Sequence, residues 1–152
     1  MVDRIVELIP RERVRAWKNV TATDAAAASI NGGMPHLPGA MLLESMAQAA
    51  GLLVIASLRE RAQPVLAKVQ SFGMTVPPRA GDRIEIGATL DDLRPEGARL
   101  RVTADVDGRR IASAVVFLAL IPIDGGEQRQ RLASRLAVLF PEWFAPLIEA
   151  TP

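Results

Sequence analysis

The chain has 152 residues, no cysteine and a net charge of +1, from 18 Lys and Arg against 17 Asp and Glu. A domain of this size buries enough surface to fold without cross-links, and the lack of cysteine excludes a disulfide-stabilised extracellular scaffold. The even charge balance and the absence of Tyr argue against a nucleic-acid binder, which needs a basic surface and often stacking aromatics. The first residues, MVDR, place charges where a signal peptide is apolar, so we expect a cytoplasmic protein.

Two short β-type runs open the chain, at residues 2–8 and 14–20, with a turn at 10–12 between them. Residues 24–29 are rich in alanine and predict one or two helical turns. Five of the nine residues from 31 to 39 are glycine or proline. This composition predicts an irregular loop.

The segment from 40 to 58 carries one charge, Glu44, in about five helical turns. A helix that is apolar on all sides is either a membrane span or the buried centre of a domain. Glu44 and Gln48 lie within the segment, and a carboxylate in hydrocarbon is costly. We therefore expect no membrane span, but a buried helix that a curved sheet covers.

The strands of this sheet follow the helix. Residues 84–90 and 98–106 alternate apolar and polar side chains, as half-buried antiparallel strands do. Asp107-Gly108 is a strong hairpin signal, and residues 111–121 are almost all apolar. Two strands, a buried helix and three or four further strands predict an α+β fold.

The C-terminal part begins after this last strand. Residues 127–140 have an amphipathic helical pattern, which Pro141 ends. Trp143 and Phe144 make the tail too apolar to stand free, so we expect it to pack on the sheet edge or on a neighbouring subunit. We expect a main domain over 1–123 and a helical extension over 124–152 packed on it.

The run LPGAMLLESMAQAAG (37–51) closely resembles the central-helix motif of the (3R)-hydroxyacyl-ACP dehydratases of fatty-acid synthesis. VDRIVEL (2–8) and AWKNVT (16–21) are similar to that family's first two strands, and PPRAGD (77–82) to its proline-rich turn. The resemblance covers about residues 2–121. It implies a hot-dog fold, in which a curved antiparallel sheet wraps one long helix, and a dimer with its sites at the interface.

The resemblance also implies an activity. The family removes water across Cα–Cβ of acyl chains on an acyl carrier protein, without a cofactor. A His takes the α-proton, a carboxylate on the central helix of the other subunit protonates the departing hydroxyl, and backbone N–H groups at the helix start hold the thioester carbonyl. Glu44 matches the carboxylate and Gln48 the polar residue one turn later. Gly39 matches the helix start.

The catalytic histidine does not match. Ungapped counting from either side places the family's position on Ile30. The chain's only histidine, His36, is six residues later and becomes the candidate general base. A metal site is not expected from one His and no Cys. Ile30, Leu37 and Met41 complete the expected substrate-binding residues with Gly39 and Gln48.

Three functions stay open. The first is a dehydratase with Glu44 as acid and His36 or a water as base. The second is a non-catalytic subunit or acyl-binding module that pairs with an active homologue. The third is a hot-dog thioesterase, in which Glu44 activates water. In each case the expected partner is an acyl thioester on acyl carrier protein or coenzyme A. The expected assembly is a homodimer or higher oligomer, or a heterodimer with an active homologue.

Overall fold

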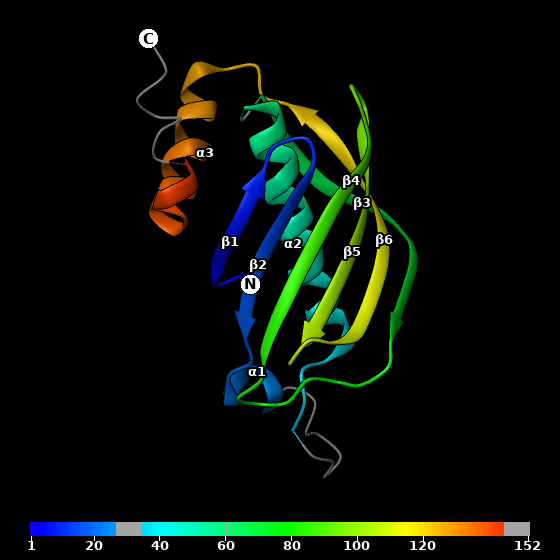
Figure 1. Ribbon diagram of the computed structural model, residues 1–152. Helices are drawn as coiled ribbons and strands as arrows, with labels where there is room; N and C mark the ends of the chain where they lie inside the picture. The colour runs from blue at the N-terminus through cyan, green and yellow to red at the C-terminus, as the bar shows by residue number, and fades with distance from the viewer. Residues whose placement is uncertain (27–34, 60, 145–152) are drawn as a thin grey trace.

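A six-stranded antiparallel sheet curves around one long helix in the computed structural model, which describes residues 1–26, 35–59 and 61–144 (Figure 1). The strand order across the sheet is β1-β2-β4-β5-β6-β3. The elements in chain order are β1 (Arg4–Ile9), β2 (Arg13–Asn19), α1 (Ala22–Ala26), α2 (Gly39–Leu58), β3 (Ala62–Met74), β4 (Arg83–Arg94), β5 (Gly97–Val106), β6 (Arg109–Pro122) and α3 (Gly126–Leu139). The predicted α+β class is confirmed.

Helix α2 forms the centre of the core. It is long and apolar enough to cross a membrane by composition, but 61% of its most apolar stretch is buried inside the fold. Leu42, Met46 and Leu53 are fully buried against the inner face of the sheet. The helix ends at Arg59, which has a left-handed backbone (φ 51°) and whose N–H donates to the carbonyls of Ile55 and Ala56. The predicted core helix is therefore confirmed.

Strands β4, β5 and β6 form the meander that the alternating pattern predicts. Ile84 and Ile86 on β4 and Leu100 and Val102 on β5 are buried, while the residues between them are more exposed. The β5–β6 hairpin turns at Asp107 (φ 49°) and Gly108 (φ 74°). Positive φ at both positions is the type I′ geometry that matches the twist of a hairpin.

Strand β3 was not assigned from the sequence. It pairs antiparallel with β6 at the edge of the sheet, with irregular register near Leu66 and Val69. Most of its residues are exposed, so no apolar face repeats along it. Pro64 and Gly73 weaken the pattern further, since both residues are rare inside central strands. An edge strand of this kind has little to distinguish it from a loop.

Helix α3 lies beside the C-terminal half of α2 and runs in the opposite direction (Figure 1). Leu136, Phe140 and Phe144 are buried, and the two phenylalanine rings lie 6.5 Å apart. The indole N–H of Trp143 donates to the carbonyl of Ile5 on β1 at 3.3 Å. The C-terminal segment is thus fixed to the first edge strand of the sheet as far as residue 144.

Candidate active site

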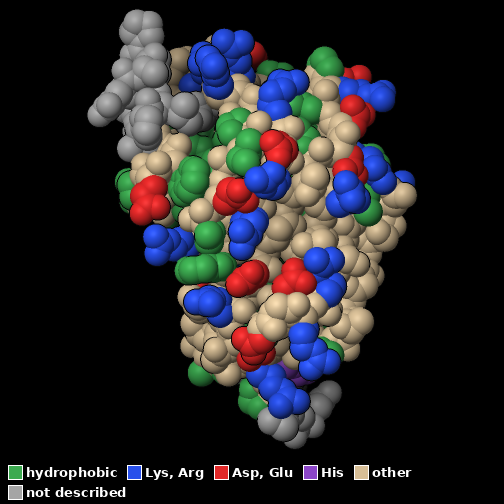
Figure 2. Space-filling view, in the orientation of Figure 1, with side chains coloured by type: hydrophobic (Ala, Val, Ile, Leu, Met, Phe, Trp, Pro, Cys, Tyr) green, Lys and Arg blue, Asp and Glu red, His purple; other side chains and the backbone are tan. Residues whose placement is uncertain are grey.

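His36 lies directly before α2, in a short backbone bridge with Arg79. The bridge joins this segment to the turn before β4, and Leu37 N–H donates to the carbonyl of Pro78 at 2.7 Å. His36 is half-buried and Arg79 exposed. Figure 2 shows Lys and Arg side chains around the histidine at this end of the molecule.

The start of α2 contains three of the expected substrate-binding residues. Leu37 is fully buried and packs in the core, and Met41 is half-buried against it. Gly39 is the first helical residue, and among the described residues the N-cap position, Pro38, makes no side-chain capping hydrogen bond. N–H groups of an uncapped first turn are available to an anionic oxygen. Ile30 lies outside the described residues.

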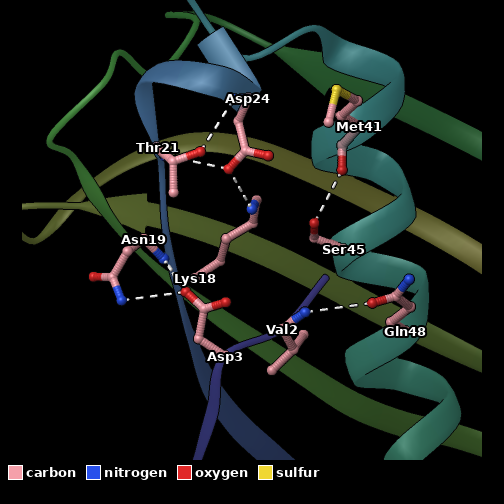
Figure 3. A network of polar contacts seen from close by, with 9 residues as sticks. All are labelled: Val2, Asp3, Lys18, Asn19, Thr21, Asp24, Met41, Ser45 and Gln48. Carbon is pink, nitrogen blue, oxygen red and sulfur yellow. Dashed lines mark hydrogen bonds and ion pairs between the residues drawn. The ribbon is translucent and has the colours of Figure 1, made fainter.

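Glu44 and Gln48 are one turn apart on α2 and interact as their spacing predicts. The Nε2 group of Gln48 donates to Oε1 of Glu44 at 2.9 Å. The other end of the amide, Oε1, accepts from the N–H of Val2 at 3.3 Å (Figure 3). Gln48 therefore links the candidate carboxylate to the first residues of the chain.

Glu44 is exposed in the single chain, so its carboxylate is solvated although it lies within an apolar helix. Among the described residues, Gln48 donates a hydrogen bond to it. The helix pattern could not distinguish a face turned to the sheet from a face turned away from it.

An apolar groove of about 360 Å³ begins at this pair. Residues from α2, β3, β6, α3 and the N-terminal segment line it, and Glu44 and Gln48 supply the polar side chains. Neither His36 nor Gly39 is among the lining residues of the described chain. The lining consists of Met1, Val2, Glu44, Ala47, Gln48, Gly51, Leu52, Ile55, Pro64, Leu66, Leu118, Leu136, Leu139 and Phe140.

A buried ion pair lies near the first turns of α2 and was missed by the sequence analysis. The ammonium of Lys18, a residue that is 3% exposed, lies 3.0 Å from Oδ2 of Asp24. Figure 3 shows Lys18 extending from β2 towards Asp24. A signal was present, because Val14, Ala16 and Lys18 alternate on the inner face of β2.

Asp24 also completes a capping box at the start of α1. Its N–H donates to Oγ1 of Thr21 at 3.1 Å, and its carboxylate accepts from the N–H of Thr21 at 3.2 Å. The hydrogen bond from Lys18, and then those from Thr21, hold the pKa of Asp24 below its ordinary value. The ion pair therefore fixes α1 to β2.

No group of three or more His, Cys, Asp or Glu side chains that could hold a metal ion occurs in the described part of the chain.

Solved structures share the fold at low sequence identity. The hot-dog-like protein from Thermanaerovibrio acidaminovorans superposes with a TM-score of 0.64 and 19% identity, over 84% of this chain and 93% of that one. The Streptococcus mutans protein smu.793, bound to acetyl CoA, gives a TM-score of 0.63 and 17% identity, over 78% of this chain and 88% of that one. The predicted hot-dog fold is thereby confirmed.

Sequence comparison is more specific. No family model matches the chain. The 3-hydroxyacyl-[acyl-carrier-protein] dehydratase FabZ of Nitratidesulfovibrio vulgaris is 31% identical over 123 residues, 79% of this chain and 80% of the relative. The FabZ of Myxococcus xanthus is 32% identical over 139 residues, 88% of this chain and 89% of the relative. At this identity and coverage, the chain belongs to the family of 3-hydroxyacyl-[acyl-carrier-protein] dehydratases.

Proposed function

We propose that this chain removes water from a (3R)-hydroxyacyl thioester to give a trans-2-enoyl thioester. The observation that carries the proposal is Glu44, which accepts a hydrogen bond from Gln48 at an apolar groove, within the helix segment that resembles the family motif. The groove offers an apolar surface to an acyl chain, and the Glu44 carboxylate would lie beside the polar thioester end of the substrate.

In the proposed step a base takes the proton from Cα. The electron pair of the broken Cα–H bond then forms the second bond between Cα and Cβ. The Cβ–O bond breaks, and the hydroxyl leaves as water after receiving a proton from the Glu44 carboxyl group. Negative charge develops on the thioester oxygen. The uncapped N–H groups at the start of α2, at Gly39, are the donors that would stabilise it. The reaction needs no cofactor.

The proposed base is His36, with a water as the alternative. His36 does not line the groove of its own chain, whereas Glu44 does. A site at a dimer interface would bring Glu44 of one chain to His36 of the partner subunit, as the family arrangement implies. In such a site Leu37 and Met41, next to His36 and at the first turn of α2, would contact the substrate, and Ile30 would take the place of the family histidine.

A homodimer is part of this proposal. Strand β3 is at the edge of the sheet and exposes Val65, Leu66 and Val69, which are 43%, 38% and 36% exposed. An exposed apolar edge strand is a surface that pairs with another strand. Pairing of β3 with its copy would extend the sheet across two chains.

We further propose a cytoplasmic location and an acyl carrier protein as the thioester carrier. Carrier recognition needs a basic surface near the site entrance, and Arg79 beside His36 provides an exposed positive charge there. Arg59 is at the opposite end of α2, about 30 Å away by helix length, so it does not contribute to the same surface. Coenzyme A is the alternative carrier.

The test is hydration of an enoyl thioester, and dehydration of the hydroxyacyl thioester as its reverse, by the unaltered protein, Glu44→Gln and His36→Ala. Loss of an acid or base lowers the rate by about 10²- to 10⁴-fold. Glu96→Gln is the matched control, because Glu96 is also exposed but lies in the β4–β5 turn, outside the groove. Unchanged rates in both site variants would refute the assignment of these residues.

Thioester hydrolysis is the second candidate. Glu44 is exposed and able to activate water, and the family histidine is replaced by Ile30, a loss that affects hydrolysis less than dehydration. Release of free thiol from a saturated acyl thioester, without hydration of the enoyl substrate, would favour it. An inert homodimer that regains activity with a homologue would favour the pairing-subunit function.

A further inference from the structure

The first residues of the chain connect β2 to α2 (Figure 3). Val2 is 3% exposed, and its N–H donates to Oε1 of Gln48 on α2 at 3.3 Å. The next residue, Asp3, is held by β2. Its N–H donates to the carbonyl of Trp17 at 2.9 Å. Its Oδ2 accepts from the backbone N–H of Asn19 at 2.7 Å and from the side-chain amide of Asn19 at 3.2 Å. The N–H of Val2 therefore has a defined position beside α2.

The contact with Val2 fixes the direction in which the Gln48 amide faces. A backbone N–H can only donate, so the atom of the amide that faces Val2 is the carbonyl oxygen. The amide nitrogen then faces Glu44 and donates to its Oε1 at 2.9 Å. An amide turned the other way would present its oxygen to Glu44. That oxygen would accept the proton of the neutral carboxyl group and hold it away from a substrate.

The direction of these hydrogen bonds also determines which oxygen of Glu44 carries the proton. The carbonyl oxygen of a neutral carboxyl group is a better acceptor than its hydroxyl oxygen, so Oε1 is the carbonyl oxygen and the proton lies on Oε2. Resting on the proposed function, we propose that Val2 and Asp3 position Gln48, so that Glu44 presents its proton on Oε2 to the departing hydroxyl group. After the transfer, the ionised Glu44 still accepts from Gln48, and this charge-assisted bond is the stronger one.

Two substitutions of Val2 separate its N–H from its side chain. Both Val2→Pro and Val2→Ala remove the valine side chain, but only proline also removes the N–H. We expect Val2→Pro to lower kcat for dehydration about fivefold with little change in KM, as the loss of one orienting hydrogen bond does. Val2→Ala should act mainly on KM, because the Val2 side chain lines the groove.

Two further variants test whether Val2 acts through Gln48. Gln48→Met should lower kcat at least as much as Val2→Pro. In the Gln48→Met protein, Val2→Pro should have no further effect on kcat, because its N–H then has no amide to orient. Asp3→Ala releases the hold of β2 on this segment without changing Val2, and should lower kcat by a smaller factor. Asp3 is exposed, so this change leaves the core intact.

The Gln48 amide provides a readout that does not need turnover. In ¹⁵N-labelled protein, its two Nε2 protons should give well separated NMR signals, because one of them donates to Glu44. The signals are identified by their loss in Gln48→Met. Val2→Pro and Asp3→Ala should move them towards the position of a free glutamine side chain, and Val2→Ala should not.

The two readouts distinguish this inference from the proposed function. Amide signals that stay in place in a folded Val2→Pro protein overturn the inference. So does an active enzyme whose kcat ignores Val2→Pro, and so do losses from Val2→Pro and Gln48→Met that multiply in the double variant. In a protein without dehydratase activity, signals that move with Val2→Pro but not with Val2→Ala support the positioning of Gln48 and refute only the proposed function. If circular dichroism shows that Val2→Pro does not fold, Asp3→Ala decides by the same two readouts.

Discussion

The Lys18–Asp24 ion pair allows a test of how strongly a buried charge pair stabilises the contact between β2 and α1. The Lys18 side chain is 4% exposed and its ammonium lies 3.0 Å from Asp24, whose side chain is 22% exposed. Removing one member of a buried pair costs about 3–5 kcal/mol, because the other charge is left in a poor solvent. Since water reaches part of Asp24, we expect Asp24→Ala to lower the free energy of unfolding by about 3 kcal/mol.

Three further variants separate the charge pair from the capping box. Thr21→Ala removes the capping hydroxyl but keeps the ion pair, so it should cost about 1 kcal/mol. Lys18→Met leaves a carboxylate that is partly solvated and still accepts from Thr21, so it should also cost about 1 kcal/mol. The double variant Lys18→Met with Asp24→Ala should cost well below the sum, about 1–2 kcal/mol, since no charge remains buried.

Urea unfolding at pH 7 and fixed protein concentration measures these differences, and for a chain of this length each kcal/mol corresponds to about 2–4 °C in Tm. The folded-state pKa of Asp24 is lowered by the hydrogen bond from Lys18. The stabilisation that the ionised Asp24 gives to the fold is therefore fully present above the unfolded carboxyl pKa of about 3.9. This stabilisation is lost as the pH falls through the lower pKa of Asp24 in the folded state. Equal destabilisation by Asp24→Ala and Thr21→Ala would refute the reasoning, since it would mean that Lys18 gains nothing from its partner.

Two further predictions concern the hairpin and the proposed dimer. Gly108→Ala should lower the free energy of unfolding by about 1 kcal/mol in urea, because φ is 74° at that position. Gly125→Ala is the control and should cost much less, because φ is −113° there and no atom lies near the new methyl group. Equal losses would contradict the turn assignment. Val69→Lys on β3 should convert the proposed dimer to a monomer, measured by light scattering, with an unchanged circular dichroism spectrum. Val138→Lys, the control, should leave the dimer intact. A Val69→Lys variant that remains a dimer would place the interface elsewhere.

The parts of the fold that were predicted from the sequence are those with a strong periodic signal. The central helix has one charged residue in its whole length, and the hairpin at 107–108 needs two residues that tolerate positive φ. Strand β3 was missed because an edge strand with both faces partly exposed has no alternation to detect. Lys18 was missed because a lysine is assumed to lie outside, although the period of β2 turns it inwards.

The candidate site was predicted only where its parts are local. The hydrogen bond between Gln48 and Glu44 depends on one helical turn, so their spacing is sufficient to predict it. The groove is lined by side chains from residues 136–140 together with side chains from residues 44–55, and no pattern in the sequence indicates that these segments meet. The exposure of Glu44 depends on which side of α2 the sheet covers, and the apolar pattern of that helix is almost uniform around its axis.

The proposed dimer would account for two features of the single chain that look like defects. Glu44, the proposed proton donor, is exposed, although general acids work best where water is excluded. Strand β3 exposes a row of apolar side chains at the edge of the sheet. If two chains pair through β3, the partner covers this edge and also approaches the open face of α2 that carries Glu44. The proposed reaction then requires the dimer, so the Val69→Lys monomer should lose enoyl hydration although every residue assigned to the chemistry is intact. A monomer with full activity would show that the site is complete within one chain.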